Sequence, residues 1–356
     1  MPDPKALANP AALTRWLDAH APEIGAEPLE IGFLHGGTSN VILTIDRGGA
    51  PAVLRRPPPV APPNSEKAMM REARLLTALG GSDVPHPRLY GMCSDPGLIG
   101  APFYVMARID GWAPELGERG CSYPALFDRA ERRREMGFAM VDALASLARV
   151  DPDAIGLSDF GKPGNFLERQ VDRWLGQLAA YPLRYPAYTP RALPGIEEVA
   201  AWLRTHLPAD QRRGIVHGDF GPPNILFDPA PPTRVRAIID WELATIGDPL
   251  FDLALLLCNL CDAAEPEAIP PAAYFDPTDF PTRQEMIARY AALTGRDMGG
   301  FDYYLVLAQF RMACILEYKV AAAAGRRAEA GAMAIFPDMV INLMRQAHTM
   351  VRCQAG

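Results

Sequence analysis

Hydrophobic and polar positions alternate in the first third of the sequence and repeat at helical spacing in most of the rest. The segment Leu29 to Asp46 reads as a strand, a Gly-Gly turn and a second strand. A further strand is predicted at Ala52–Arg55, and the stretch Pro102–Gly111 reads as a strand that ends in a glycine turn. Beyond about Asp110 the clearest helical stretches are Arg132–Arg149, Gly164–Leu178 and Ile196–Leu207. We therefore predict an α+β protein with a small β-rich N-lobe, residues 1–108, and a larger, mainly helical C-lobe, residues 109–356.

One helix is predicted inside the N-lobe. It runs from Glu66 to Leu79, and its apolar side carries Ala68, Leu75, Leu76 and Leu79.

Composition narrows the class of protein and its partners. The chain has 49% hydrophobic and 22% charged residues, as in an ordinary globular protein. Its 36 prolines are about twice the usual share, and their clusters at 57–63, 222–232 and 268–281 predict loops. The formal net charge is −7, without a lysine- or arginine-rich tract, so nucleic acid is not an expected partner.

Nothing in the sequence predicts export or membrane insertion. Residues Met1–Lys5 lack the apolar segment of a signal peptide, and the apolar stretch Leu253–Leu257 is too short to span a bilayer. The six cysteines form no dense framework, so we expect a cytoplasmic protein with free thiols. Cys258 and Cys261 are spaced as Cys-x-x-Cys, but no second Cys or His pair lies near them, which favours a buried helix over a metal site.

The polar segment His217–Asn224 carries the densest candidate chemistry. It reads His-Gly-Asp-Phe-Gly-Pro-Pro-Asn, and Asp240 follows later at the end of an apolar run. Phosphoryl transfer from a nucleotide needs a carboxylate to take the acceptor's proton and oxygen ligands for magnesium. Kinase catalytic loops supply these groups as an Asp and an Asn five positions apart, with a second Asp after a nearby strand. The competing interpretation, in which these residues only form turns, explains neither their order nor their spacing.

This motif set resembles the aminoglycoside phosphotransferase and choline-kinase-like family, whose loop reads His-Gly-Asp where protein kinases have His-Arg-Asp. The segment Gly247–Ala254 is similar to the one that follows the metal-binding Asp in those enzymes. The resemblance implies a two-lobed protein-kinase-like fold with ATP and Mg²⁺ as cofactors, bound between the lobes. It further implies that Asp219 is the catalytic base, that His217 braces the loop, and that Asn224 and Asp240 are magnesium ligands.

The Gly-Gly turn of the N-lobe is the expected phosphate-binding loop. Glycines let backbone amides approach phosphate oxygens closely, and polar side chains can add donors. The candidate residues are Gly36, Gly37, Thr38, Ser39 and Asn40. A plain hairpin turn remains the alternative interpretation.

Arg55 stands where protein kinases carry the lysine that contacts the nucleotide phosphates. Arginine keeps the charge and offers a bidentate fork, although its geometry differs from that of lysine. Glu72, on the helix that follows, is the expected partner of Arg55, and a solvent-facing charge is the alternative interpretation. Arg56 is the other candidate for the phosphate contact, but strand alternation turns it to the opposite face.

In the resembled fold, the stretch Pro102–Gly111 is the hinge between the lobes. Backbone groups from Ala107 to Ile109 are then expected to hydrogen-bond adenine. The side chains expected to line the base are Val41, Val53, Met106, Leu226 and Ile239. Each of these positions is equally compatible with the hydrophobic core, and only their joint placement predicts a pocket.

These features predict an ATP-dependent phosphotransferase that acts on a hydroxyl of a small molecule. No long activation segment with an Ala-Pro-Glu motif follows Thr245, which disfavours a protein acceptor. Aminoglycosides are polycations and would need a strongly acidic pocket, whereas the C-terminal third is only mildly acidic.

Three segments resemble the kinase-like domains associated with acyl-CoA dehydrogenases, which implies a hydroxyacyl-CoA acceptor; they are Phe33–Asn40, Val53–Pro58 and Gly100–Met106. An antibiotic kinase and a nucleotide-binding module without turnover are alternative functions. A metal-dependent hydrolase is a further alternative, and it would use His217, Asp219, Asp240 and Asp248.

Overall fold

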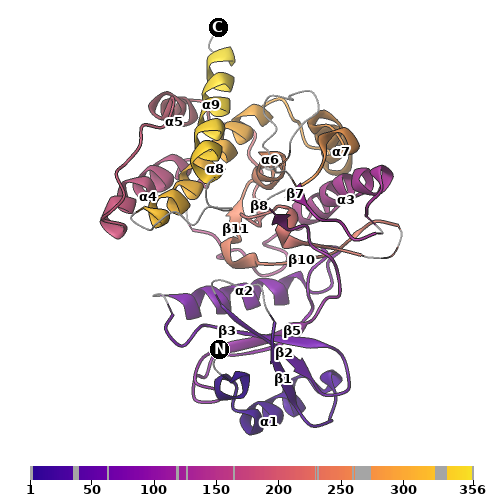
Figure 1. Ribbon diagram of the computed structural model, residues 1–356. Coiled ribbons are helices and arrows are strands. Elements are labelled where there is room, and N and C mark those ends of the chain that lie inside the picture. The colour runs from indigo at the N-terminus through magenta and orange to yellow at the C-terminus, as the bar shows by residue number, and fades with distance from the viewer. Residues whose placement is uncertain are drawn as a thin grey trace.

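The small lobe is built on a five-stranded antiparallel sheet with the strand order β1-β2-β3-β5-β4 (Figure 1). The strands are β1 Glu30–Phe33, β2 Val41–Asp46, β3 Ala52–Arg56, β4 Leu89–Cys93 and β5 Phe103–Ala107. The alternation of the sequence predicts all of these strands except β4. The computed structural model describes residues 3–34, 40–61, 64–117, 120–125, 127–162, 165–228, 230, 232–258, 260, 274–324 and 335–354.

Two helices cover opposite faces of this sheet (Figure 1). Helix α1, Pro10–His20, packs on the outer face, where Leu13 and Leu17 join Leu43, Leu54 and Phe103 in one buried cluster. Helix α2, Ser65–Leu79, lies on the other face, between the sheet and the large lobe. The predicted helix from Glu66 to Leu79 is therefore confirmed.

The apolar side of α2 packs in one cluster with the large lobe and with β4 and β5 of the sheet. Its buried residues Met69, Ala73, Leu75, Leu76 and Leu79 belong to the same cluster of buried side chains as the C-lobe helices, and the cluster under α1 is separate. Although α2 lies in the N-terminal part of the sequence, its packing thus joins it to the large lobe.

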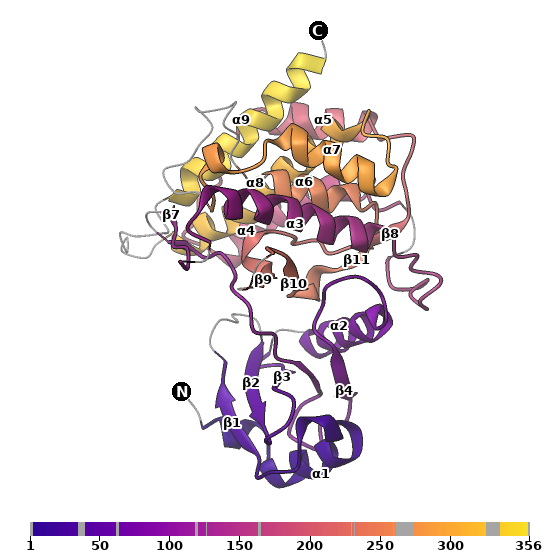
Figure 2. The same cartoon turned by 90° about the vertical axis from the view of Figure 1, so that its right-hand side faces the viewer.

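The large lobe is mainly helical, as predicted (Figure 2). Its helices are α3 Ala130–Ala148, α4 Gln170–Arg184, α5 Ile196–Thr205, α6 Leu250–Cys258, α7 Arg283–Thr294, α8 Phe301–Ala323 and α9 Phe336–Gln354. Helix α8 contacts α4, α5, α6 and α9, and most of its side chains are buried, so it is the centre of this lobe. No helix in the part of the chain that the structure describes is long and apolar enough to cross a membrane.

The prediction of a helix over Gly164–Leu178 is wrong in its bounds. The helix begins at Gln170, because residues before it form turns in which Asn165 accepts a hydrogen bond from the N–H of Leu167. It continues through Pro182 to Arg184, six residues beyond the expected end at Leu178. Residues 163 and 164 lie outside the described part of the chain.

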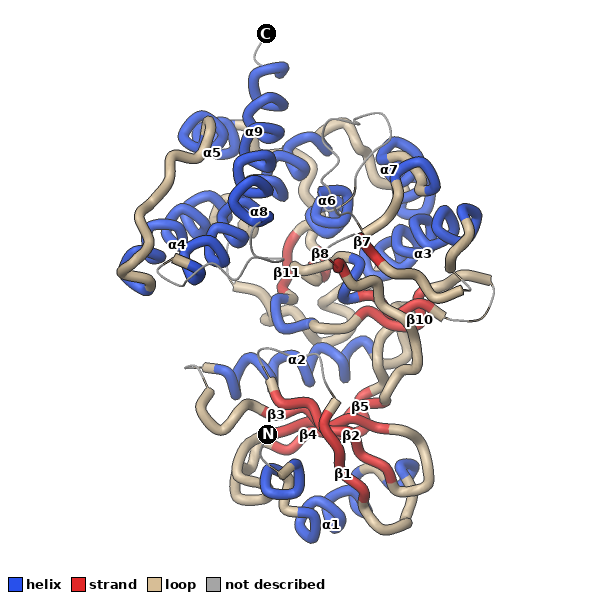
Figure 3. Tube along the Cα trace, in the orientation of Figure 1, coloured by secondary structure: helices blue, strands red, loops and turns tan. Residues whose placement is uncertain are grey.

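Short strands lie where the large lobe meets the small one (Figure 3). Strands β9 Ile225–Phe227 and β10 Val235–Ile238 form an antiparallel hairpin, and β8 Gly214–Val216 pairs with β11 Thr245–Gly247. Two further short strands, β6 Leu116–Gly117 and β7 Gly120–Cys121, pair with each other. The chain enters this region at Gly111, where a Cβ atom would lie 2.9 Å from the Cβ of Leu226, so glycine permits the close approach.

Candidate active site

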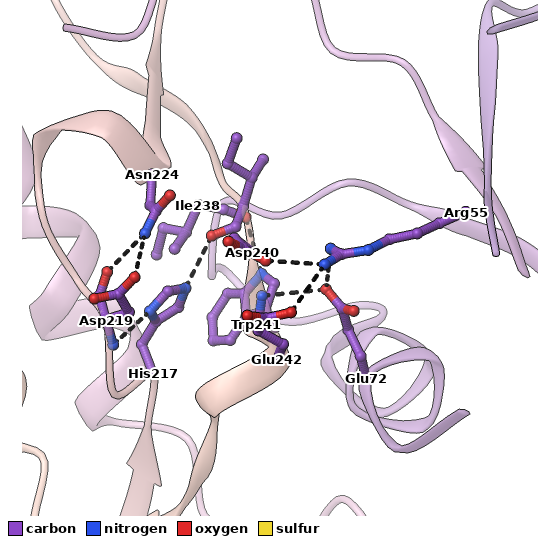
Figure 4. Close-up of polar contacts among 10 residues, drawn as sticks. Arg55, Glu72, His217, Asp219, Asn224, Ile238, Asp240, Trp241 and Glu242 are labelled. Carbon is purple, nitrogen blue, oxygen red and sulfur yellow. Dashed lines mark hydrogen bonds and ion pairs between the residues drawn. The ribbon is translucent and has the colours of Figure 1, made fainter. Parts of the chain in front are cut away.

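The loop after β8 holds Asp219 at the surface and ties it to Asn224. Asp219 is exposed, and the Asn224 Nδ2 group donates to the Asp219 carboxylate at 3.0 Å and to the Asp219 carbonyl at 2.9 Å (Figure 4). Gly218 just before it has φ +82°, a conformation that side chains with a Cβ rarely adopt. The loop thus presents a carboxylate and an amide together, as the spacing of the two residues predicts.

His217 links this loop to the residue before Asp240. Its Nδ1 atom accepts a hydrogen bond from the N–H of Asp219 at 3.2 Å, so the ring proton resides on Nε2 and is donated to the Ile239 carbonyl at 3.0 Å. Burial lowers the pKa of the imidazole, which favours the neutral ring that this arrangement requires. The predicted bracing contacts of His217 are therefore present.

Two buried residues without a predicted role bind the backbone of the loop at His217 and Gly218. The Asp252 carboxylate accepts hydrogen bonds from the N–H groups of His217, at 2.6 Å, and Gly218, at 2.9 Å. Arg311, in the middle of α8, donates to the Gly218 carbonyl. Burial lowers the pKa of Arg311 to about 10, opposed by Asp219 and Asp252, so the guanidinium remains charged at neutral pH.

Asp240 sits in a left-handed backbone conformation, with φ 63° and ψ 61°, at the start of the 3-10 turn η4, Trp241–Leu243. This conformation costs a residue with a Cβ about 1–2 kcal/mol, and Asp tolerates it better than most. The N–H of Trp241 donates to Glu72 Oε1 at 3.2 Å, which fixes the turn against α2. The Asp240 side chain is 38% exposed and points toward Arg55 (Figure 4).

Arg55 joins the two lobes at this point. Its Nη1 group donates to Glu72 at 2.8 Å, and Nη2 donates to Asp240 at 3.0 Å and to Glu242 at 3.5 Å (Figure 4). The side chain of Asn40, with its amide oxygen toward Arg55, accepts hydrogen bonds from Nε at 3.2 Å and Nη2 at 3.0 Å. The predicted Arg55–Glu72 pair is thus confirmed as a contact, and Glu72 does not face solvent.

Three carboxylates surround the single guanidinium of Arg55. Burial lowers the pKa of Arg55, but Glu72 and Asp240 among others outweigh it and the net pKa is raised. Burial raises the pKa of Glu72 to about 7, partly offset by Arg55. Burial and the charge of Asp240 raise the pKa of Glu242. The group therefore carries an excess of negative charge that attracts cations.

Strand register places Arg56 and Val41 on the far face of the sheet. Arg56 donates to the carbonyls of Leu7 and Ile99, on the α1 side. Val41 is paired with Arg56 and packs against the cluster under α1, because directly opposed residues of an antiparallel pair point to the same face. The prediction that Val41 lines the adenine pocket is therefore wrong.

Ile42, paired with Arg55, takes the place on the Arg55 face that was expected of Val41. Val53 and Met106 are paired on that same face, as predicted, and Met106 is half-buried. Leu226 on β9 and Ile239 after β10 are also half-buried, on the large-lobe side.

Part of the hinge stretch Pro102–Gly111 is hydrogen-bonded to neighbouring segments of the sheet. The N–H of Ala107 donates to the Arg88 carbonyl at 2.8 Å, and the N–H of Arg108 donates to the Pro51 carbonyl at 3.0 Å. Hydrogen bonding therefore continues past the end of β5, and those two N–H groups are occupied. Ile109 follows directly and is half-buried, so its N–H remains the candidate donor to adenine.

The remaining residues that the sequence analysis singled out are not among the contacts around Asp219, Asp240 and Arg55. Gly36, Gly37, Thr38 and Ser39, as well as Cys261, lie outside the described residues. Asp248, required by the hydrolase alternative, is buried elsewhere, where it accepts hydrogen bonds from Arg296 at 2.7 Å and Tyr304 at 2.8 Å. The structure thus separates Asp248 from Asp219 and gives it a role in the core.

Sequence reasoning missed Glu242, Asp252 and Arg311. Asp252 lies in the segment that resembles known enzymes, and Glu242 follows Asp240 by two residues, so both had a usable signal. Arg311 is a charged residue in the long apolar helix α8, and such a residue, when buried, needs a specific partner.

A family model spans both lobes of the chain. The model of the phosphotransferase enzyme family matches residues 30–285, which include Arg55, Glu72, Asp219 and Asp240. The chain belongs to this family.

Curated relatives of this phosphotransferase are longer proteins. Acyl-CoA dehydrogenase family member 10 of Mus musculus is 32% identical over 320 residues, covering 88% of this chain and 28% of the relative. The probable acyl-CoA dehydrogenase IBR3 of Arabidopsis thaliana is 34% identical over 295 residues, covering 78% of this chain and 34% of the relative. The chain thus spans about a third of the length of these relatives.

Solved structures share the fold of this phosphotransferase. A crystal structure from Ralstonia eutropha, of a protein designated an aminoglycoside phosphotransferase, has a TM-score of 0.79 at 28% identity and covers 96% of this chain and 98% of that one. A ternary complex of an APH(4)-Ia aminoglycoside phosphotransferase mutant with ADP and hygromycin B has a TM-score of 0.56 at 16% identity and covers 96% and 98%. The prediction of a two-lobed kinase-like α+β fold is confirmed.

Proposed function

We propose that this phosphotransferase moves the γ-phosphoryl group of ATP to a hydroxyl of a small molecule. The observation that carries the proposal is the continuous set of contacts from Asp219 through His217 and Ile239 to Asp240, Arg55 and Glu72. It joins a candidate base, candidate metal ligands and a candidate phosphate contact from both lobes. Such transfer depends almost entirely on positioning and electrostatic stabilisation.

Asp219 is the proposed general base. Asn224 donates to its Oδ2 atom, and no described side chain donates to Oδ1, so that oxygen is open to an acceptor hydroxyl. The contact from Asn224 fixes the direction of the carboxylate, and the exposed position lets a substrate reach it.

Asn224 and Asp240 are the proposed ligands of Mg²⁺. Both offer oxygen atoms, which this hard cation prefers, and one or two protein ligands suffice when phosphates and waters complete the coordination. Arg55 brings one positive charge to Glu72, Asp240 and Glu242, so the donor set fits a divalent cation. When bound, Mg²⁺ would neutralise charge on the phosphates.

Arg55 is the proposed phosphate contact, and Glu72 holds it. The Nη2 group that now reaches Asp240 and Glu242 is the part of the guanidinium nearest the proposed metal site. Its fork can bind a phosphate oxygen pair that lysine cannot span. Val53, Met106, Leu226 and Ile239 would contact the adenine, with Ile42 in place of Val41.

A hydroxyacyl-CoA is the acceptor we favour. The C-terminal third of the sequence is only mildly acidic, which suits an anionic acceptor better than a polycation. The names of the two curated relatives also point to acyl-CoA chemistry.

An aminoglycoside is the second candidate acceptor, because the Ralstonia protein that covers nearly the whole chain is designated an aminoglycoside phosphotransferase. The two candidates differ in the sign of their charge. They are therefore readily separated by a single screen.

The test is ADP formation in a screen of hydroxyacyl-CoAs, aminoglycosides, choline and sugars, with Asp219→Asn beside the wild type. We expect acceptor-dependent ADP with a hydroxyacyl-CoA, and Asp219→Asn should lower turnover by about 10²- to 10⁴-fold, the usual contribution of a positioned base. Nucleotide affinity should barely change, because the variant keeps the shape of the side chain. Acceptor-dependent turnover by Asp219→Asn within about threefold of the wild type would refute the assignment of the base. Tight nucleotide binding without ADP formation by any acceptor would favour the module without turnover.

A further inference from the structure

Two adjacent residues of α2 hold the two ends of the short turn that begins at Asp240. Glu72 accepts a hydrogen bond from Trp241, the first residue of η4, at 3.2 Å. Arg71 donates from Nη1 to the carbonyl of Ala244, the residue that ends the same turn, at 2.7 Å. The left-handed Asp240 is thus the first residue of a segment that α2 anchors on both sides.

Arg71 is bound entirely by the large lobe. Its Nη2 group donates to the carbonyl of Phe160 at 2.6 Å, and its guanidinium carbon lies 3.8 Å from the centre of the Phe160 ring. Among the described residues no carboxylate pairs with Arg71. A half-buried cation shared by two carbonyls and an aromatic face has a narrowly defined position.

The segment that contains Phe160 also packs on the strand after the turn. A Cβ atom on Gly161 would lie 2.7 Å from the Cβ of Ile246, so the missing side chain lets this segment lie directly against β11. Arg71 therefore binds the turn at Ala244, and through the Phe160 carbonyl it also binds the segment that packs against β11. Movement of the turn at Ala244, or of the segment that contains Phe160, would break a hydrogen bond to the guanidinium of Arg71.

We propose that Arg71 is a positioning residue that keeps the Asp240 carboxylate directed at the metal-bound nucleotide. The proposal rests on the proposed function, because it takes Asp240 as a metal ligand. Asp240 is held in a disfavoured backbone conformation, and release of one end of the turn allows it to relax. Loss of a residue that orients a metal ligand typically weakens metal binding about 10- to 100-fold.

Arg74 offers a matched control. It lies one turn further along α2 and also contacts the large lobe, through Asp159 at 2.5 Å and the Gly156 carbonyl at 2.8 Å. It does not contact the turn from Asp240 to Ala244. Arg74→Met thus removes a contact between α2 and the large lobe of the same kind as Arg71→Met, without touching the proposed metal site.

The test uses the full chain and Mn²⁺ with the ATP analogue AMP-PNP as the probe, measured by calorimetry. Arg71→Met should weaken Mn²⁺·AMP-PNP binding about tenfold or more, and Arg74→Met should leave it within about twofold of the wild type. Arg71→Lys, which keeps the charge and can reach one carbonyl, should recover part of the affinity. In the nucleotide-free variants, hydrogen exchange at residues 241–246 should be faster in Arg71→Met than in Arg74→Met.

Each outcome is separable from failure of the proposed function. If the wild type does not bind Mn²⁺·AMP-PNP, the proposed function fails first. If the wild type binds it and Arg71→Met binds equally well with unchanged exchange at 241–246, the positioning role of Arg71 is wrong. Equal losses in Arg71→Met and Arg74→Met would also overturn it, because they would show a general effect of α2 docking.

Discussion

His217 is fully buried, and burial lowers the pKa of its imidazole below the ordinary 6.5. Its neutral Nδ1 accepts the N–H of Asp219, and protonation of that nitrogen would remove this hydrogen bond. A group with a lowered pKa in the folded state contributes stability that is fully present above the unfolded pKa and is lost as the pH falls toward and through the folded pKa.

We therefore expect the wild type to lose unfolding free energy more steeply below about pH 6.5 than a His217→Gln variant, whose amide does not titrate in this range. The measurement is urea unfolding of both proteins at several pH values between 5 and 8. The difference between the two proteins should be largest at pH 8 and should shrink toward pH 5. A constant difference across the range would show that His217 does not change its protonation between the folded and unfolded states.

At the scale of a single element, two neighbouring arginines of strand β3 point to opposite faces of the sheet and make different contacts. Arg55 faces Glu72 and Asp240, and Arg56 faces the α1 side, where it donates to carbonyls of Leu7 and Ile99. Register therefore separates a residue of the proposed site from a residue of the small-lobe core by one position.

Arg56→Met should destabilise the protein by about 1–3 kcal/mol, since it leaves buried carbonyls without a donor, and should leave the Michaelis constant for ATP unchanged. Arg55→Met should raise that constant, and it should also lower stability because it leaves the buried Glu72 carboxylate without its partner. Thermal unfolding and steady-state kinetics on both variants check the pair. An Arg56→Met protein with a normal melting temperature and impaired use of ATP would show that the strand register is wrong by one residue.

The elements near the site were largely predictable, because each is defined by local pattern. Alternation predicted β3, and helical spacing predicted α2, so the Arg55–Glu72 pair followed from the two together. Val41 was misassigned because its side depends on its pairing with Arg56, which the sequence of β2 alone does not specify. Arg311 was missed for a related reason: its partner, Gly218, is 93 residues away, and only the packing of α8 brings the two together.

In the whole molecule, the two clusters of buried side chains do not follow the division of the sequence into an N-lobe and a C-lobe. The buried side chains of α2 lie in the same cluster as the large-lobe core, which also includes Tyr104 of β5, whereas the outer face of the sheet shares a separate core with α1. Arg71 and Arg74 add polar contacts from α2 to the large lobe. If the lobes move when nucleotide binds, the sheet should move against α2, with α2 remaining on the large lobe.

This division predicts the order of local opening. Amide hydrogens of α2 should exchange at rates close to those of α8, and amides of β1 and β2 should exchange faster, because cooperative units follow shared cores. Native-state hydrogen exchange with mass spectrometry at low denaturant concentrations measures this. If α2 instead exchanges together with β1 and β2, the first 108 residues form one cooperative unit.

The left-handed conformation of Asp240 has a consequence for the adaptation of this protein to heat. Glycine adopts that conformation without the steric cost that any side chain incurs, so position 240 is one where substitution by glycine relieves backbone strain. Selection for thermal resistance alone would therefore favour the loss of the very carboxylate on which the proposed chemistry depends. Natural or laboratory lineages that must remain active have to gain their heat tolerance elsewhere in the fold, at positions where stability and turnover do not compete.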